Sequence, residues 1–389
     1  MSGVTGIAML GCGYVANMYR LTLAGHPRLK LVAVHDRERS RAETMARLTG
    51  ARTAPDLDAL CADPEVRIVL NLTNPREHYA TTKRLLEAGK HVYTEKPVAM
   101  DYAEAKALAA LAQAKGLMLT SAPCTLLSPA AQGLWRAVRE KRAGEIRLIY
   151  AEMDDGMVQR MPTAKWINEA GVAWPAVDEF EVGCTVEHSG YVLGWLCAMF
   201  GPATSVTAFS TTLAPDKVPG LAITDAPDFS VACVTFEDGP VLRLTNGIYA
   251  EHDHRLRLFG DAGVLTVEDP RSDRSPVALR RYRTLRRKRF LEPWSRKMPL
   301  PGAAEKIAAY RGSQTRDFCR AIADMAAALE GGRRPALDTD FGLHVTEVTL
   351  ACHYATHPSG AAKGYGGGTY AVESRFARPV PLTEQGGAA

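Results

Sequence analysis

The sequence lacks the features that define several large classes of protein. No window reaches the roughly 18 uninterrupted apolar residues of a membrane-spanning helix, and the first ten residues show no secretory pattern. The eight cysteines never form a Cys-x-x-Cys pair, which argues against a disulfide framework or a thiolate metal site. A net charge of +4 over 389 residues implies no general attraction to nucleic acid or to a membrane. We therefore expect a cytoplasmic chain with reduced thiols, and its length suggests two or three domains.

The sequence offers one candidate pair of metal ligands, His252 and His254. Alternate residues of a strand share one face, so two imidazoles placed in this way can approach a common ion. No third ligand stands nearby in the sequence. We therefore expect no metal.

The first 122 residues alternate apolar, β-type runs with segments of helical period. The expected strands are 6–10, 29–36, 66–73, 91–97 and 117–123, with helices between them. Strands that are apolar throughout are buried on both faces, which is typical of a parallel sheet wrapped by helices. Residues 1–122 are therefore predicted to form a doubly wound α/β domain of the Rossmann type.

A glycine-rich turn, GCGYVA, follows the first expected strand and opens a helix. Its glycines allow a tight turn and a close approach of the backbone to a pyrophosphate, which then meets the N–H groups at the helix start. A purely structural strand-to-helix turn is the alternative. The context favours a cofactor site that includes Gly11, Gly13, Tyr14, Val15 and Ala16.

The second expected strand ends at Asp36, where a carboxylate can accept hydrogen bonds from an adenosine ribose. Asp36 favours NAD over NADP, because a carboxylate repels a 2′-phosphate. Arg37 and Arg39 weaken this preference, since a neighbouring arginine can receive the phosphate. NAD is the expected cofactor, with NADP as the alternative.

Polar residues also follow the later strands of this domain. Ligands of open α/β sheets bind at the carboxyl ends of the strands, so these residues are expected to face the cofactor cleft. A lysine followed by proline at the end of a buried strand is unusual, although a solvated lysine is the alternative. The residues are Thr73, Asn74 and His78, followed by Glu95, Lys96 and Pro97.

Together, GCGYVA, Asp36, TNPREH at 73–78 and above all AGKHVYTEKPVA at 88–99 resemble the Gfo/Idh/MocA oxidoreductases, named for glucose–fructose oxidoreductase and inositol dehydrogenase. The Glu-Lys-Pro box is the specific part of this resemblance. The resemblance implies a nicotinamide cofactor and a sugar or cyclitol substrate. It also implies that Lys96 contacts both the nicotinamide ribose and the reacting hydroxyl.

From residue 123 the strict alternation gives way to consecutive strand-like runs separated by Asp-Gly and other glycine-containing turns. This pattern predicts a second, α+β domain, residues 123–389, with a large and mainly antiparallel sheet. Two late helices are expected around 314–330 and 341–353. The Gly-rich segment 360–370 is expected to be loosely ordered or ordered by a partner. In the resembling family an open sheet face commonly makes subunit contacts, so a homo-oligomer, dimer or tetramer, is expected.

A polar cluster, Glu187, His188 and Tyr191, interrupts an apolar stretch that is expected to be helical over 183–200. Residues four apart share a helix face, which places Glu187 and Tyr191 together. The resembling family usually carries Asp-x-Gly-x-His here, so Tyr191 takes the place of the proton-transferring histidine and His188 is additional. We predict that Lys96 and Tyr191 flank the reacting oxygen and that the charge of Lys96 assists proton transfer by Tyr191. Glu187 is expected to orient or charge-pair with Lys96, and His188 to bind substrate or complete a relay. A buried trio that serves only packing is the alternative.

Two further segments have a candidate role. The aromatic and acidic residues of 154–179 are expected to cover the substrate, since aromatic faces beside carboxylates suit sugar rings. These are Asp154, Asp155, Trp166, Trp174 and Glu179. The Arg- and Lys-rich segment 278–290 is expected to be a solvated face, with contact to substrate phosphates or to another subunit as the alternative.

The predicted function is hydride transfer between a nicotinamide cofactor and a secondary alcohol or ketone of a sugar, cyclitol or nucleotide-linked sugar. The residue types that support it are a cationic lysine and a tyrosine that can exchange a proton. One alternative is a protein that binds NAD for structure or regulation without turnover. Another is a tightly held cofactor that is recycled within one site.

Overall fold

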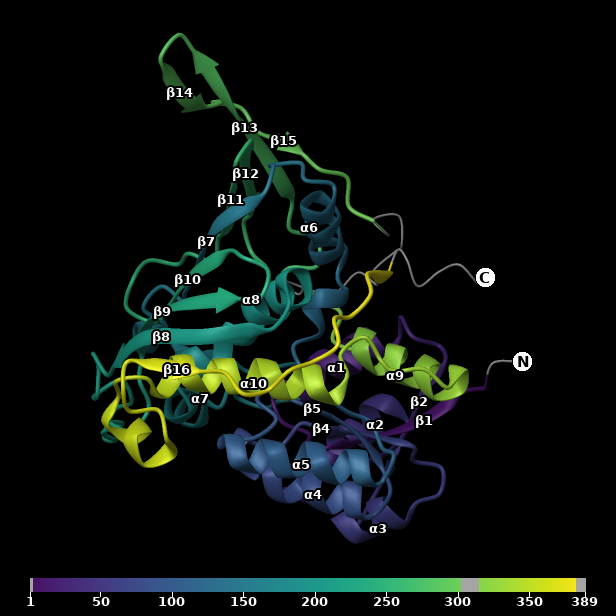
Figure 1. Cartoon of the computed structure of the whole chain (residues 1–389). Helices are drawn as coiled ribbons and strands as arrows, with labels where there is room; N and C mark the ends of the chain where they lie inside the picture. Colours follow the sequence, from purple (N-terminus) through teal and green to yellow (C-terminus); the bar gives the residue numbers. More distant parts are fainter. Residues whose placement is uncertain (1–2, 302–314, 383–389) are drawn as a thin grey trace.

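The computed structural model describes residues 3–301 and 315–382, and Figure 1 shows their arrangement. The first domain is built on a six-stranded sheet with the order β3-β2-β1-β4-β5-β6. All of its strand pairs are parallel, which confirms the predicted doubly wound α/β fold. Its strands are β1 (Thr5–Leu10), β2 (Leu29–His35), β3 (Arg52–Thr53), β4 (Ile68–Asn71), β5 (His91–Thr94) and β6 (Leu119–Ser121).

Helices cover both faces of this sheet, because its central strands are apolar on both sides. Every residue of β4 is buried, and so is every residue of β1 except Gly6. Burial of this kind contributes about 1.5–3 kcal/mol for each large apolar side chain. The helices are α1 (Ala16–Leu23), α2 (Arg39–Thr49), α3 (Leu57–Ala62), α4 (His78–Glu87) and α5 (Tyr102–Ala114).

The second domain contains a larger sheet with the order β14-β13-β12-β11-β7-β10-β9-β8-β16, and β15 pairs with β13. The pair β7–β10 is parallel and the other pairs are antiparallel, which confirms the predicted mainly antiparallel sheet. Its first five strands are β7 (Ile146–Asp154), β8 (Ala203–Thr211), β9 (Phe229–Phe236), β10 (Val241–Gly247) and β11 (Leu256–Gly260). The others are β12 (Gly263–Val267), β13 (Val277–Leu285), β14 (Lys288–Leu291), β15 (Arg296–Lys297) and β16 (Thr369–Ala371).

The helices α6 (Pro129–Arg139), α7 (Ala176–Val182) and α8 (Cys184–Phe200) belong to the second domain. Helix α8 is buried along almost its whole length and packs against β10, β9 and β7. It begins after Gly183, whose φ of 90° and close approach to the carbonyl of Pro227 exclude a side chain at this position. A buried helix of this kind gives its few polar side chains fixed positions.

The late helices lie between the two sheets (Figure 1). Helix α10 (Thr339–Tyr354) packs against α5 and β6 of the first domain and against α8 and β8 of the second. Helix α9 (Arg320–Gly331) begins later than expected, and Gln314, where the expected helix began, lies outside the described residues. In the described ranges, no helix is long and apolar enough to span a membrane.

The Gly-rich segment differs from its prediction, because much of it has regular structure. Residues Pro358–Lys363 form a short helix, and β16 adds to the sheet beside β8. The Arg-rich segment forms the β13–β14 hairpin, which projects from one end of the molecule (Figure 1). Most residues of its outer half are exposed, as predicted for a solvated face.

Candidate active site

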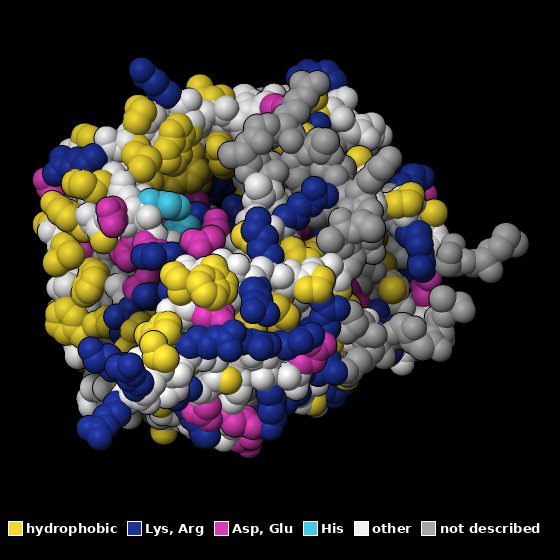
Figure 2. Space-filling model, turned by 90° about the horizontal axis from the view of Figure 1, so that it is seen from above, with side chains coloured by type: hydrophobic (Ala, Val, Ile, Leu, Met, Phe, Trp, Pro, Cys, Tyr) yellow, Lys and Arg dark blue, Asp and Glu magenta, His cyan; other side chains and the backbone are white. Residues whose placement is uncertain are grey.

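A cleft of about 840 Å³ opens at the carboxyl ends of β1, β2, β4 and β5, where the first domain faces α8 and the segment before it. On the face shown in Figure 2, acidic, basic and histidine side chains gather around a hollow, in keeping with the charged lining of this cleft. On the first-domain side the lining includes Gly11, Gly13, Tyr14, Val15, Asp36, Arg37, Arg41, Thr73, Asn74, Glu95 and Lys96. On the second-domain side it includes Trp174, Glu179, Glu187, His188, Tyr191, Arg271 and Arg316.

The glycine-rich turn has the shape that a dinucleotide requires. Gly11 has a φ of 93°, and a Cβ there would lie 2.6 Å from the carbonyl oxygen of Leu72, so only glycine fits. A Cβ on Gly13 would meet no atom within 4 Å, so Gly13 faces open space. In the described ranges, the amides of Gly13, Tyr14 and Val15 donate no hydrogen bond, and they remain able to bind an anion at the start of α1. Ala16 does not line the cleft; it is fully buried where α1 packs on the sheet.

Asp36 stands at the end of β2 as predicted. Its Oδ2 accepts the amide hydrogen of Cys12 at 2.7 Å and its Oδ1 accepts that of Glu38 at 2.8 Å. The carboxylate is thereby fixed beside the glycine-rich turn. Arg37 and Arg41 line the same part of the cleft, whereas Arg39 pairs with Glu43 on the surface. Arg41 was not predicted from the sequence. It stands in the first turn of α2, four residues after Arg37, and lines the same cleft.

His78 does not line the cleft, in contrast to its prediction. Its ring is fully buried, with Nδ1 2.7 Å from the carbonyl oxygen of Pro97 and Nε2 3.1 Å from that of Thr73. Pro97 itself lies behind the cleft. His78 thus connects the loops that follow β4 and β5, and it supports the cleft without lining it.

Lys96 and Glu187 form an ion pair between the loop after β5 and helix α8. Burial alone would lower the pKa of Lys96, but the attraction of Glu187 and the nearby carboxyl groups raises it above its usual range. Glu95 fixes this loop, because Oε2 accepts the amide hydrogen of Lys96 and Oε1 accepts the hydroxyl of Tyr19 at 2.6 Å. Lys96 is therefore a fixed cation in the cleft.

Glu179, on α7, extends this pair. Burial and the neighbouring carboxylate of Glu187 raise the pKa of Glu179 well above its usual range. It shares a hydrogen bond with Glu187. Burial would raise the pKa of Glu187, but the ammonium of Lys96 lowers it. Lys96, Glu187 and Glu179 thus form a row of three interacting ionisable groups.

Tyr191 lies one turn after Glu187 and faces the same cleft. The structure differs from the prediction in the cation that contacts it, because Nη1 of Arg316 donates a hydrogen bond to the Tyr191 hydroxyl at 2.8 Å. Arg316 stands 125 residues away in the sequence. No motif surrounds Arg316, so no local pattern in the sequence indicates this contact.

His188 lines the cleft and belongs to a second polar group on its second-domain side. Its Nε2 lies 3.1 Å from Asp155, which also contacts His254 Nε2 at 3.0 Å and Arg271 Nη1 at 3.5 Å. Burial lowers the pKa of His188 to about 4, so its ring is neutral at pH 7. Nε2 then carries the hydrogen that faces Asp155, and Nδ1 is left as an acceptor without a partner in the described ranges.

Asp155 also supplies the third potential metal ligand that the sequence reasoning lacked. Ligand atoms of Asp155, His252 and His254 lie within 4.8 Å of one another. The guanidinium of Arg271 already contacts the Asp155 carboxylate, and its permanent charge opposes a second cation there. We interpret the group as a hydrogen-bond network, and the expected absence of a metal stays a prediction.

Two residues of the covering segment differ from their predicted roles. Asp154 is buried and does not line the cleft, and burial beside Glu152 raises its pKa to about 6. Trp166 packs behind Trp174, with ring centroids 5.1 Å apart, and only Trp174 reaches the cleft. The segment does cover the first domain, because Asn168 donates a hydrogen bond to the carbonyl of Tyr14 at 3.1 Å.

The fold and the cleft define a two-domain protein of the Rossmann type whose second domain completes the cleft. The family model described as "Oxidoreductase family, NAD-binding Rossmann fold" matches residues 5–122, and the "GFO/IDH/MocA C-terminal domain" matches residues 132–266. The chain belongs to the Gfo/Idh/MocA family. Its first domain is the NAD-binding domain of that family.

Known relatives are distant. The chain is 30% identical over 166 residues to trans-1,2-dihydrobenzene-1,2-diol dehydrogenase of Oryctolagus cuniculus, a match that covers 42% of this chain and 50% of that enzyme. The chain thus spans about half the length of that relative.

Solved structures match over most of the chain. The WlbA dehydrogenase from Bordetella pertussis, solved with NADH and UDP-GlcNAcA, has a TM-score of 0.69 at 18% identity and covers 93% of this chain and 97% of its own. The 3-ketoreductase KijD10 from Actinomadura kijaniata, solved with NADP, has a TM-score of 0.67 at 19% identity and covers 89% and 96%. Likeness at this level of identity shows the fold alone.

Proposed function

We propose that the chain transfers a hydride between NAD or NADP and a secondary alcohol or ketone of a sugar, cyclitol or nucleotide-linked sugar. The observation that carries the proposal is one cleft that joins the glycine-rich turn and Asp36 to Lys96, Glu187 and Tyr191. When bound, the nicotinamide supplies or accepts the hydride. The remaining work is to bind the substrate oxygen and to move its proton.

Lys96 is suited to bind that oxygen. Its raised pKa keeps it an ammonium, so it donates hydrogen bonds and stabilises negative charge on the oxygen but does not act as a base. Glu187 holds the ammonium in place through their ion pair, and Glu179, whose pKa is raised, interacts in turn with Glu187. The row of three thus gives Lys96 a single position.

Tyr191 is the residue that we assign to proton transfer. It faces the cleft on the same side of α8 as Glu187, and its hydroxyl can both donate and accept. His188 is less suited, because its Nε2 hydrogen is committed to Asp155 and its pKa is about 4. The sequence left open whether Tyr191 or His188 transfers the proton. We propose Tyr191.

The relatives support the substrate class. One solved relative was crystallised with UDP-GlcNAcA, another is a 3-ketoreductase, and the relative from Oryctolagus cuniculus is a dehydrogenase of a cyclic diol. The ketoreductase has also been solved with a single lysine or a single tyrosine replaced. The three names describe two dehydrogenases and one ketoreductase.

The test is a panel assay on the purified chain that follows absorbance of the reduced cofactor. The panel contains glucose, myo-inositol, UDP-N-acetylglucosamine and trans-1,2-dihydrobenzene-1,2-diol, each with NAD and with NADP. The proposal predicts reduction of the cofactor by at least one cyclic alcohol. Tight cofactor binding without turnover of any panel compound would instead support a structural or regulatory cofactor. Cofactor that copurifies after extensive dialysis would support recycling within one site.

We further propose that the chain forms a homo-oligomer through the open face of the second sheet. Large side chains on that sheet remain exposed, among them Phe209, which is 50% exposed. Light scattering after size exclusion tests this proposal, and Phe209→Asp is expected to shift the mass toward the monomer. The expected cytoplasmic location stays a proposal as well; all eight cysteines are unpaired, as in a reducing compartment.

A further inference from the structure

We propose that Arg316 is the positioning residue that directs the Tyr191 proton into the cleft and balances the charge that its transfer leaves behind. The inference rests on the proposed function, since it assigns a partner to the proton-transferring tyrosine. It replaces Lys96 as the cation that acts on Tyr191. Lys96 instead pairs with Glu187 and, in the proposed function, binds the substrate oxygen.

The direction of the hydrogen bond between Arg316 and Tyr191 determines where the Tyr191 hydrogen points. A guanidinium has donors and no acceptor, so Arg316 Nη1 must donate to the Tyr191 oxygen over their 2.8 Å contact. The Tyr191 hydrogen then has to point away from Arg316. Because Tyr191 lines the cleft, the remaining direction leads toward bound substrate. Arg316 thus selects the rotamer in which the hydroxyl is a donor to the cleft.

The guanidinium is held between two aromatic rings. Its Cζ lies 5.4 Å from the centroid of Tyr191 and 5.2 Å from that of Phe318. Contacts at this range are attractive for a cation over a ring and fix the plane of the guanidinium. Arg316 itself is only partly exposed.

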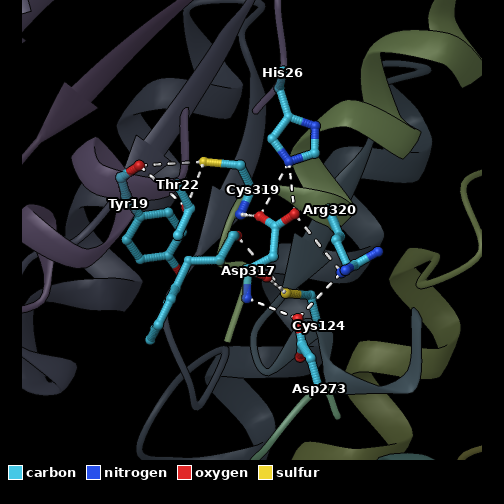
Figure 3. Close-up of polar contacts among 9 residues, drawn as sticks. Tyr19, Thr22, His26, Cys124, Asp273, Asp317, Cys319 and Arg320 are labelled. Atoms are coloured by element: carbon cyan, nitrogen blue, oxygen red, sulfur yellow. Dashed lines mark hydrogen bonds and ion pairs between the residues drawn. The ribbon is translucent and has the colours of Figure 1, made fainter. Parts of the chain in front are cut away.

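The residues that follow Arg316 in the sequence attach their segment to the first domain, and Figure 3 shows the contacts of Asp317 and Cys319. The Asp317 carboxylate lies 2.9 Å from His26 Nε2, just after α1, and the Asp317 amide donates to Asp273 at 2.9 Å. The Cys319 thiol contacts the Thr22 hydroxyl at 3.3 Å. These buried contacts join α1, the Asp273 loop and the start of α9. They leave the backbone beside Arg316 little freedom, so the guanidinium reaches Tyr191 from a fixed point.

The contact between Arg316 and Tyr191 accounts for the proton and the charge in the proposed reaction. In the ketone-to-alcohol direction the carbonyl carbon receives the hydride, and the carbonyl oxygen receives the Tyr191 proton. The Tyr191 oxygen keeps the electron pair of its broken O–H bond and becomes a phenolate, which water later reprotonates. The Arg316 charge already lies 2.8 Å from that oxygen, so the new negative charge forms an ion pair without rearrangement. In the oxidation direction the same steps run in reverse.

The first experiment tests the contact without any substrate. The chain is labelled with [¹³Cζ]tyrosine, and the Tyr191 resonance is assigned by its absence from Tyr191→Phe. We expect this resonance to move in Arg316→Gln and to stay in place in Arg147→Gln, a surface arginine that pairs with Asp261. An unmoved Tyr191 resonance in folded Arg316→Gln overturns the proposal.

The second experiment tests the role in turnover, with UDP-N-acetylglucosamine and trans-1,2-dihydrobenzene-1,2-diol as probes. We expect Arg316→Gln to lower kcat by at least about tenfold with little change in the KM for NAD, and to show a larger solvent deuterium isotope effect. Added guanidinium ion should restore part of kcat, and Arg316→Lys should keep more activity than Arg316→Gln. A wild-type kcat in Arg316→Gln, or equal losses in Gln and Lys variants without rescue, contradicts it. If the wild type turns over no compound of the four-compound panel, the proposed function fails, while the resonance still decides the contact.

Discussion

Lys96 and Glu187 form an ion pair that spans the two domains, from the loop after β5 to the first turn of α8. Their side chains are 20% and 9% exposed, so the pair is largely shielded from water. Breaking a buried pair leaves one uncompensated charge, which costs more than the pair contributes. This relationship determines the charge, and hence the role, of Lys96.

Glu187→Gln should therefore impair both stability and turnover. Lys96 would lose its partner and its fixed position, so we expect a loss of about 2 kcal/mol in unfolding free energy and at least about tenfold in kcat. Denaturant unfolding and steady-state assays measure these quantities. The matched control is Glu145→Gln, which removes an exposed pair with Lys141 and should change stability by less than about 0.5 kcal/mol. Equal effects in the two variants would refute the buried pair as the organising contact.

The two glycines of the first turn should respond differently to alanine. Gly11→Ala forces a Cβ against the Leu72 carbonyl at a positive φ, so it should lower the melting temperature. Gly13→Ala meets no protein atom but reduces the open space of the cleft, so it should weaken NAD binding and leave the melting temperature unchanged. Calorimetry and NAD titration compare the two. A Gly13→Ala variant with full NAD affinity would place the pyrophosphate elsewhere.

Asp36→Asn should shift cofactor preference toward NADP. Asparagine retains an oxygen for the Cys12 amide but removes the charge that repels a 2′-phosphate, while Arg37 and Arg41 remain at the cleft. We expect the ratio of NADP to NAD affinity to rise by about tenfold or more, equal to about 1.4 kcal/mol. Titration of both cofactors measures the ratio. An unchanged ratio would show that Asp36 does not face the ribose.

His188 should make the protein less stable in acid. Its pKa is about 4 when folded and 6.5 when unfolded, so between these values the unfolded chain binds more protons. Stability should therefore rise with pH from about 4 to 6.5 and then level off, with at most about 3 kcal/mol from this residue. His188→Gln should flatten this part of the curve in denaturant titrations at several pH values. An unchanged slope would indicate that His188 is charged in the folded state, beside Asp155.

Much of the cofactor half could be predicted from the sequence, because its signals are local. A turn, a strand end and a Glu-Lys-Pro box each occupy a few consecutive residues. The parallel strands place all three at the carboxyl edge of the first sheet. Local patterns also predicted helix α8 and its shared face for Glu187 and Tyr191. Ala16, His78 and Pro97 belong to these motifs, but their side chains are buried and do not line the cleft.

The substrate half depended on contacts between distant segments, which no local pattern reveals. Arg316 reaches Tyr191 only because Asp317 and Cys319 attach their segment to α1. The pattern at 187–191 left His188 open as a proton carrier, but in the structure Asp155 lies against its Nε2. Trp166 and Asp154 had suitable chemistry, but strand and ring packing directed them elsewhere.

The most direct test of the account is turnover by Lys96→Ala and Tyr191→Phe at saturating cofactor. The reacting oxygen loses its ammonium in one variant and its proton donor in the other. We predict that each variant loses at least about a hundredfold in kcat and binds NAD within about threefold of the wild type. Near-normal turnover in both variants, with cofactor bound, would contradict the central claim that Lys96 and Tyr191 act on the substrate oxygen.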